Sequence, residues 1–279
     1  MTATLASAAP TPAAIRPAGW FTQTGQVFRR WITTTARQAW GPVMSLLQPV
    51  IWILLFGQVF TSLGALPAFG ADGYLPYLVP GVLMMTVLYS GAWAGTGYLD
   101  DIRSGVMDQL LTAPIARTAI VTGQLLQQLV INLLQSAIVL AIGFAGGARY
   151  PGGVGGVALA LVAASLLAAA FCSMSTAVAL TTRSQVALIG LSQTIVLPAT
   201  FLSTTMMPAE LLPDWIASIA AWNPLTWAVE VGRAGLDGSA FDGSGDAALV
   251  LGRLGLLAAL AGLAFWWSVS SLRSYQRSI

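Results

Sequence analysis

The chain has 279 residues, of which 56% are hydrophobic and only 8% are charged, and its formal net charge is +2. A water-soluble domain carries about 25% charged residues, so this chain cannot bury its apolar residues in one soluble core. We therefore expect an all-helical membrane protein that crosses the bilayer several times. The small net charge argues against nucleic acid as a partner.

The basic residues are all arginine, and the chain contains neither lysine nor histidine. An ordinary phosphate-binding P-loop needs a lysine, so any ATP chemistry is expected in another polypeptide. The absence of histidine excludes a Ser-His-Asp triad, an HExxH zinc site and an imidazole proton relay, and we expect no metal site. The single cysteine, Cys172, lies in an apolar run and is expected to be a buried, unreactive thiol.

The N-terminal segment, residues 1–19, is rich in Ala, Pro and Thr and lacks the pattern of a cleaved signal peptide, so we expect a disordered cytoplasmic tail. Residues 20–41 then show a helical pattern, with Val27 and Trp31 on one face and Arg30 on the other. This pattern predicts an interfacial amphipathic helix along the lipid headgroups. A helix packed against the protein's own spans fits the pattern equally well.

Six apolar runs are each close to the ~20 residues that cross a hydrocarbon core. An even number of crossings places both termini on the same side of the membrane. We expect one transmembrane domain over 20–279, with spans at about 43–63, 75–97, 119–143, 154–180, 186–206 and 247–269.

The arginines are unevenly distributed between the two sides of this arrangement. If the termini lie inside, the inner segments hold nine arginines, whereas the outer segments hold only Arg149, Arg233 and Arg253. Because basic residues favour the cytoplasmic side, we expect both termini and the connection between spans two and three in the cytoplasm. The protein is therefore expected in the plasma membrane, in contact with lipid.

The connection between the second and third spans, residues 99–123, is a charged segment between two membrane-crossing runs. Ile102, Val106 and Leu110 recur every four residues, which predicts a helix over 99–112 with an apolar stripe. Such a stripe, if it faces outward, requires a partner. We expect this helix to be the moving part of the protein.

Pro114 limits this helix. A proline disfavours helical angles at the residue before it, so the helix should end near Thr112. A new helix, the base of the third span, should begin near Arg117. The segment is thus expected to form a helix, a break and the base of a span.

The outer segment over 207–235 holds two apolar stretches that are too short to span the membrane. They are separated by Asn223-Pro224, and three tryptophans nearby suit a membrane interface. This pattern predicts two short re-entrant helices that dip into the outer leaflet, where they are buried in protein or line a cavity. A plain external loop is the alternative.

Polar and aromatic side chains on the spans are candidates for a translocation path. We assign to this path Gln48, Trp52 and Phe56 on one face of span one, with Gln193 and Phe201 on span five. A further polar stripe follows span three, at Gln124, Gln128, Asn132 and Gln135. For that stripe we favour hydrogen bonds between helices over contact with substrate.

Three motifs stand out in the two polar segments. In the inner loop, an acidic residue, a Leu-Leu pair, a proline, an arginine and a glycine follow one another at Asp108, Leu110, Leu111, Pro114, Arg117 and Gly123. The outer segment reads Pro-x-Glu-x-Leu-Pro-x-Trp at Pro208, Glu210, Leu212, Pro213 and Trp215. It continues with Asn-Pro-Leu-Thr-Trp-Ala from Asn223, and then Arg233. With these motifs the chain resembles, over nearly its whole length, the permease subunit of ABC type-2 exporters, close to the daunorubicin-resistance branch.

The resemblance implies a transport subunit and not an enzyme, with ATP and Mg²⁺ bound by a separate ATP-binding subunit present in two copies. It also implies a second permease chain, identical or paralogous. The helix over 99–112 would be a coupling helix that docks on the ATP-binding subunit. The coupling residues would be Asp101, Ile102, Val106, Asp108, Leu110, Leu111, Pro114 and Arg117.

The outer motif is expected to help close the exit side. An ion pair between Glu230 and Arg233, one helical turn apart, is a candidate contact for this role, and a surface pair without a role in export is equally open. We assign to the outer gate Glu210, Asn223, Pro224, Glu230 and Arg233.

A path lined by apolar and aromatic residues favours a hydrophobic or amphipathic substrate, such as a drug, an antibiotic, a polyketide or a lipid. A polysaccharide or a glycolipid is the alternative. A secondary multidrug transporter is less well supported, because no acidic residue lies in the middle of an expected span. A membrane enzyme would need a nucleophile or a metal cluster, for which we find no pattern.

Overall fold

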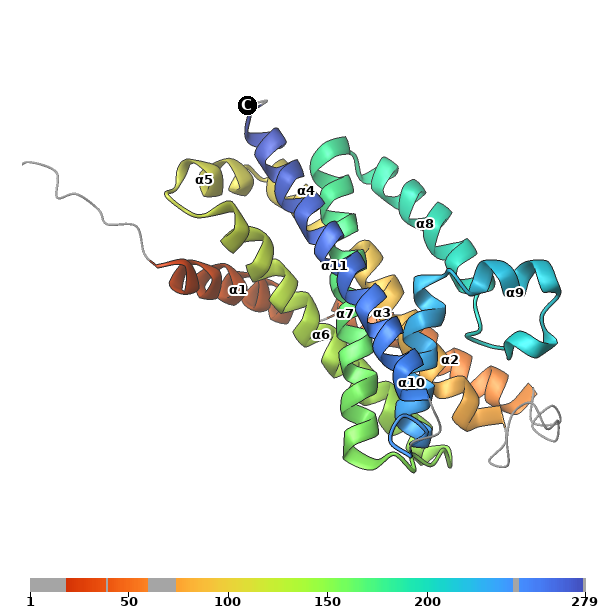
Figure 1. Cartoon of the computed structure of the whole chain (residues 1–279). Helices are drawn as coiled ribbons and strands as arrows, with labels where there is room; N and C mark the ends of the chain where they lie inside the picture. The colour runs from red at the N-terminus through yellow and green to blue at the C-terminus, as the bar shows by residue number, and fades with distance from the viewer. Residues whose placement is uncertain (1–18, 39, 60–73, 243–245, 278–279) are drawn as a thin grey trace, which may run out of the picture.

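The computed structural model describes residues 19–38, 40–59, 74–242 and 246–277, and these residues form helices and connecting turns without any strand (Figure 1). The expected tail, apart from Gly19, and the end of the first expected span lie outside them. The helices are α1 Trp20–Arg37, α2 Trp40–Val59, α3 Tyr74–Trp93, α4 Thr96–Arg103, α5 Val106–Thr112, α6 Arg117–Ala145, α7 Gly153–Thr182, α8 Gln185–Phe201, the 3-10 turn Ala209–Leu211, α9 Asp214–Ala220, α10 Pro224–Asp237 and α11 Asp246–Arg277.

Four helical stretches are long and apolar enough to cross a membrane: Tyr74–Arg103, which combines α3 and α4, then α6, α7 and Ala247–Arg277 of α11. Two further apolar helices, Val43–Val59 within α2 and the whole of α8, are shorter. The 17 residues of α8 extend about 25 Å at the rise of an α-helix, less than the ~30 Å of a hydrocarbon core. Four of the six expected spans therefore meet the length criterion.

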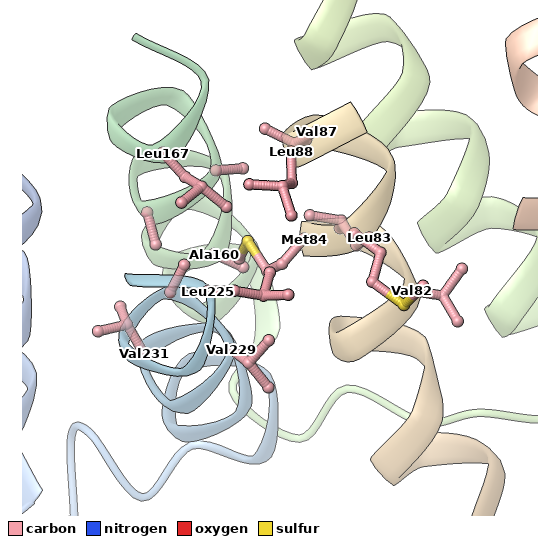
Figure 2. Close-up of a cluster of buried hydrophobic side chains, with 14 of the residues drawn as sticks. Val82, Leu83, Met84, Val87, Leu88, Ala160, Leu167, Leu225, Val229 and Val231 are labelled. Carbon is pink, nitrogen blue, oxygen red and sulfur yellow. The ribbon is translucent and has the colours of Figure 1, made fainter. Parts of the chain in front are cut away.

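The helix α7 lies at the centre of the bundle and packs against α3, α10 and α11. Its buried side is rich in alanine, which allows neighbouring helices to approach closely. Figure 2 shows Met84 of α3 pointing toward Ala160 of α7 and Leu225 of α10, and all three side chains are fully buried. Because lipid is as apolar as these side chains, close van der Waals packing is what holds such helices together in a bilayer.

Two backbones touch where α7 meets α10. A Cβ atom added at Gly152 or Gly156 would lie 1.9 Å from the carbonyl oxygen of Gly235. Only glycine fits at these positions, because the obstacle is backbone and cannot move aside. The α6–α7 turn is therefore fixed against the end of α10.

A second hydrophobic cluster lies at the end of the bundle that carries α5, called here the α5 end. It buries Tyr98 of α4, Met107 of α5, Leu188 of α8 and Leu272 of α11. The C-terminal end of α11 lies at the same end as α4 and α5 (Figure 1). The α6–α7 turn and the last residues of α10 lie at the opposite end (Figure 1).

The connection between α3 and α6 differs from the single helix expected over 99–112. It forms two helices, because α4 ends at Arg103 and α5 begins at Val106. Between them Gly105 has a φ of 74°, in the left-handed region that side chains other than glycine rarely adopt. The Ser-Gly pair at this position is a breaker signal that the fourfold apolar spacing obscured.

The second break of this connection lies where Pro114 predicts it. α5 ends at Thr112, and Ala113 has an extended backbone with a ψ of 150°. α6 then begins at Arg117. The expected helix, the break after it and the start of the next span are thus all present. The structure adds one further break, at Gly105.

The fifth apolar helix is shorter than the expected span over 186–206, because α8 ends at Phe201. Asn223 explains where it ends: its amide Nδ2 donates to the carbonyl oxygens of Ala199 and Leu202, each at 2.7 Å. These bonds satisfy carbonyls that the last turn of a helix leaves without partners. Residues 202–208 continue without regular helix.

Candidate functional site

The α4–α5 loop, residues 96–112, turns its apolar side toward the protein. Met107 is fully buried, and the three side chains Ile102, Leu110 and Leu111 pack against the cluster at the α5 end. The apolar stripe therefore does not face fully outward, because Ile102, Val106 and Leu110 are each half-buried. The break at Gly105 interrupts the stripe, and its residues complete the protein's own core.

The surface that the loop does expose is polar. Among the predicted coupling residues, Val106 is half-buried, whereas Asp108, Pro114 and Arg117 are exposed. Exposed polar residues that the stripe argument did not include are Asp100, Arg103, Gln109 and Thr112. Any partner at this end would therefore contact carboxylate, guanidinium, amide and hydroxyl groups.

The helix α1 is fixed to the α4 side of this loop. The guanidinium of Arg30 donates to both carboxylate oxygens of Asp101, from Nη1 at 2.9 Å and from Nη2 at 2.6 Å. The same guanidinium lies 4.6 Å from the ring centroid of Trp31, which is buried against Tyr98 of α4. A paired, two-point hydrogen bond of this kind fixes direction as well as distance.

The same helix also contacts the α6 side of the loop. Gln23 of α1 accepts from the backbone N–H of Ala116 at 2.8 Å and donates to the carbonyl of Pro114 at 3.3 Å. Val27 lies so close to Gly123 of α6 that a Cβ there would be 2.6 Å away. One face of α1 is thus packed on the protein's own helices, while Arg29 and other residues remain exposed on the other face.

Three residues of the polar stripe form hydrogen bonds to residues outside α6, as we favoured, whereas Asn132 accepts from Gln128 of the same helix at 3.2 Å. Gln124 donates to the carbonyl of Ala94 at 2.8 Å, and Gln128 donates to the hydroxyl of Ser90 at 2.7 Å. Gln135 donates to the hydroxyl of Ser45 of α2 at 2.6 Å. These bonds connect α6 to α2, to α3 and to the turn between α3 and α4.

The same amides line an open cavity of about 540 Å³, most of whose other lining residues come from α1, α2, α3, α4 and α6. Of the residues assigned to the path, Gln48 and Trp52 line it, and Phe56 stacks on Trp52 with ring centroids 4.6 Å apart. Gln193 and Phe201 of α8 are not among its lining residues, and Phe201 is 65% exposed. The contributions of α1 and α4 to this cavity were not foreseen, because helices far apart in sequence supply them.

The outer segment contains two helices, α9 and α10, separated at Asn223. The side chain of Asn223 accepts from the backbone N–H of Leu225 at 2.9 Å, and Pro224 occupies the first turn of α10. Because its amide also binds the end of α8, Asn223 joins α8 to α10 through one side chain.

Arg233 of α10 holds the non-helical segment that follows α8. Its Nη2 donates to the carbonyl oxygens of Thr204 at 2.8 Å and Thr205 at 2.9 Å, and its Nε donates to the carbonyl of Tyr77 at 3.3 Å. The guanidinium also lies 3.5 Å from the ring centroid of Tyr77. Arg233 therefore connects α10, α3 and the backbone beyond α8.

The predicted ion pair between Glu230 and Arg233 is wrong. Glu230 instead pairs with Arg253 of α11, with 2.9 Å between Oε2 and Nε. Arg233 faces backbone carbonyls in the interior, which a spacing argument within one helix could not foresee. Glu210, the remaining outer candidate, is exposed on the 3-10 turn.

Cys172 is buried in α7, as expected. Among the described residues, no three or more His, Cys, Asp and Glu side chains are grouped in a way that could hold a metal ion.

Comparison with known proteins gives three informative relatives. The daunorubicin resistance ABC transporter permease protein DrrB1 of Streptomyces coeruleorubidus is 28% identical over 205 residues, 74% of this chain and 71% of that protein. The putative transport permease ycf38 of Porphyra purpurea is 28% identical over 207 residues, with shares of 74% and 68%. The probable doxorubicin resistance ABC transporter permease protein DrrC of Mycobacterium tuberculosis is 22% identical over 211 residues, with shares of 76% and 74%.

The family comparison covers most of the chain. A model of the ABC-2 type transporter family matches residues 22–236, from the start of α1 to the end of α10. This range includes the α4–α5 loop, the residues that line the 540 Å³ cavity, and Arg233. The chain belongs to the ABC-2 type transporter family.

Proposed function

We propose that this chain is the permease subunit of an ATP-driven exporter, which moves a hydrophobic or amphipathic molecule out of the cytoplasm or the inner leaflet. A separate ATP-binding subunit would bind ATP and Mg²⁺ and supply the motion. Membership of the ABC-2 family supports the transport role, and two relatives carry drug-resistance names. The absence of lysine from the sequence is consistent with an ATPase in another polypeptide.

The observation that carries this proposal is the attachment of the α4–α5 loop. Two residues separate α3 from α4, and four separate α5 from α6, so a displacement of the loop acts directly on two membrane-crossing helices. The Arg30–Asp101 bond extends the same attachment to α1. The exposed polar side of the loop is then the surface that a closing ATPase pair would push.

The arrangement of the ends supports six crossings. α1 is bonded to the loop at the α5 end, whereas Tyr74 at the start of α3 donates to the carbonyl of Met206 beyond α8. The chain therefore crosses from the α5 end to the opposite end between α1 and α3. The helix that lies between them in sequence is α2, so α2 would form this crossing. A short span is accommodated by local thinning of the bilayer at modest cost.

The arginine distribution supports an α5 end that faces the cytoplasm, with both termini there and the protein in the plasma membrane. Two permease chains, identical or paralogous, would pair around a central path, and each would bind one ATP-binding subunit. The cavity suits an amphipathic substrate, because it combines the rings of Trp52, Tyr89 and Trp93 with several amides.

The proposal is tested by co-purification with the cognate ATP-binding subunit. The variant Asp108→Arg with Gln109→Arg changes only exposed residues of α5, so it should fold, lose the complex and lose substrate-stimulated ATP hydrolysis. The matched control is Arg149→Asp, which changes the charge of an exposed residue in the α6–α7 turn. A complex and an ATPase rate that survive the α5 change would refute the coupling role of this loop.

A further inference from the structure

Three arginines meet at the α5 end, where α6 begins and α11 ends. Arg117 is the first residue of α6, and its Nε donates to the side chain of Gln276 of α11 at 2.6 Å. Arg273 and Arg277 lie in the last turns of α11. Together with Gln276 these arginines line a cavity of about 280 Å³, called here the arginine pocket.

The positive charge of the arginine pocket is not compensated within the described part of the chain. The ion pairs found there are Arg30–Asp101 and Glu230–Arg253, both elsewhere. Asp108 of the neighbouring helix α5 is exposed and belongs to neither pair. Since a guanidinium does not lose its proton in proteins, like charges remain close together unless an anion joins them.

The start of α6 adds further positive potential. Its N-cap residue, Ala116, provides no side-chain acceptor, so the first turn keeps N–H groups without intrahelical partners. The dipole of this 29-residue helix also makes its N-terminus positive, which disfavours an arginine there. The negative end of α11 accounts for Arg273 and Arg277, but it does not account for Arg117. An anion at this place would satisfy all of these groups together.

The arginine pocket adjoins a second cavity of about 290 Å³, which shares Arg117 and Gln276 with it. Its remaining lining is residues 111 and 113–116, including Leu111 and Ile115, so the lining is both polar and apolar. A ligand that fills both cavities would have an anionic group at the arginines and a larger part beside Leu111 and Ile115. An anionic amphiphile has such a form, and a small inorganic anion would fill only one of the two cavities.

Aromatic side chains place the arginine pocket at the level of lipid headgroups. Trp266 and Trp267 of α11 are 69% and 41% exposed, and they precede Arg273 by about two helical turns. Trp20 is exposed beside the start of α6 and donates to the hydroxyl of Thr118. Tryptophan collects at the membrane interface, so the arginines just beyond it meet phosphate groups.

We propose that the arginine pocket binds the phosphate group of an anionic phospholipid from the leaflet at the α5 end. The guanidinium groups would hold the phosphate oxygens, and the second cavity, with its mixed lining, would hold the glycerol. Such a lipid would join the end of α11 to the start of α6, next to the α4–α5 loop. This site is separate from the 540 Å³ cavity and does not depend on the substrate of the exporter.

The test uses the full-length protein in detergent, titrated with phosphatidylglycerol, phosphatidylcholine or inorganic phosphate, with bound lipid counted by native mass spectrometry. The variant Arg273→Gln with Arg277→Gln removes two exposed arginines whose side chains form no ion pair within the described chain. The control Arg37→Gln with Arg149→Gln removes the same net charge at two exposed positions elsewhere.

We expect the unmodified chain to bind phosphatidylglycerol about tenfold or more tightly than phosphatidylcholine, and the pocket variant to lose about tenfold. The control variant should stay within about twofold of the unmodified chain. Equal binding of the two lipids by the unmodified chain would overturn the proposal, and this comparison needs no variant to fold. Displacement of phosphatidylglycerol by inorganic phosphate at equal concentration would identify a free-anion site instead, and equal losses in both variants would indicate only non-specific attraction.

Discussion

Arg233 donates hydrogen bonds to backbone carbonyls that have no partner within a helix. Residues 202–208 leave the helix α8, so their backbone carbonyls need other donors in an apolar environment. Arg233 supplies donors to Thr204 and Thr205, and the hydroxyl of Tyr77 donates to Thr204 as well. Arg233 of α10 and Tyr77 of α3 thus provide hydrogen bonds that the backbone loses where the chain leaves the helix.

Replacement of Arg233 should therefore destabilise the whole outer region. We expect Arg233→Ala to lower the free energy of unfolding by about 1–3 kcal/mol, because the buried carbonyl of Thr205 loses the donor from Arg233 and that of Thr204 keeps only the hydroxyl of Tyr77. Arg233→Lys should recover little of this loss, since an ammonium cannot reproduce the planar fork. Thermal unfolding in detergent measures the effect, with exposed Arg149→Lys as the control. A lysine variant as stable as the unmodified chain would contradict this role of the guanidinium.

At the scale of elements, local signals in the sequence predicted where helices end, but not what they contact. Pro114 and the Asn223-Pro224 pair mark breaks because proline constrains its neighbours in the chain, and the breaks lie there. The partners of Arg30 and Arg233 lie 71 and 28 or more residues away in sequence, so no spacing rule could find them.

The apolar stripe of the loop shows the same limit. Its period predicted helix correctly for Ile102 and Leu110, but not whether these residues face a partner or the protein's own core. The side that a helix buries depends on the other helices, here α8 and α11. The exposed polar residues of the loop therefore emerge only from the folded chain.

The bond between α1 and α4 gives a prediction about transmission. Arg30→Asp or Asp101→Arg alone places like charges together and should lower substrate-stimulated ATP hydrolysis by the complex several-fold. The double change Arg30→Asp with Asp101→Arg restores an opposite-charge pair and should recover at least half of the rate, for a coupling of about 1 kcal/mol. Arg29→Asp, an exposed change of equal charge on the same helix, is the control. If Arg29→Asp lowers the rate as much, the effect is one of total charge and not of this bond.

At the scale of the whole molecule, α6 fixes the two sides of the membrane. Its 29 residues extend about 43 Å, which exceeds the hydrocarbon thickness, so residues just before and just after it lie on opposite sides. The α4–α5 loop precedes α6 and the α6–α7 turn follows it. A label attached in each of these two connections therefore shows which end of the bundle faces the cytoplasm.

Cysteine labelling provides this reporter, because the native thiol is buried and should not react with the label. Cys172 is only 1% exposed, so the unmodified chain should not react with an impermeant maleimide until it is denatured. We expect Arg149→Cys to be labelled in intact cells, and Ser104→Cys, exposed at the break between α4 and α5, to be labelled only after the cells are opened. This result follows if the arginine-rich α5 end faces the cytoplasm, where an ATP-binding subunit can reach it. Labelling of Ser104→Cys in intact cells would place the loop outside, beyond the reach of ATP, and the coupling mechanism would then fail together with the orientation.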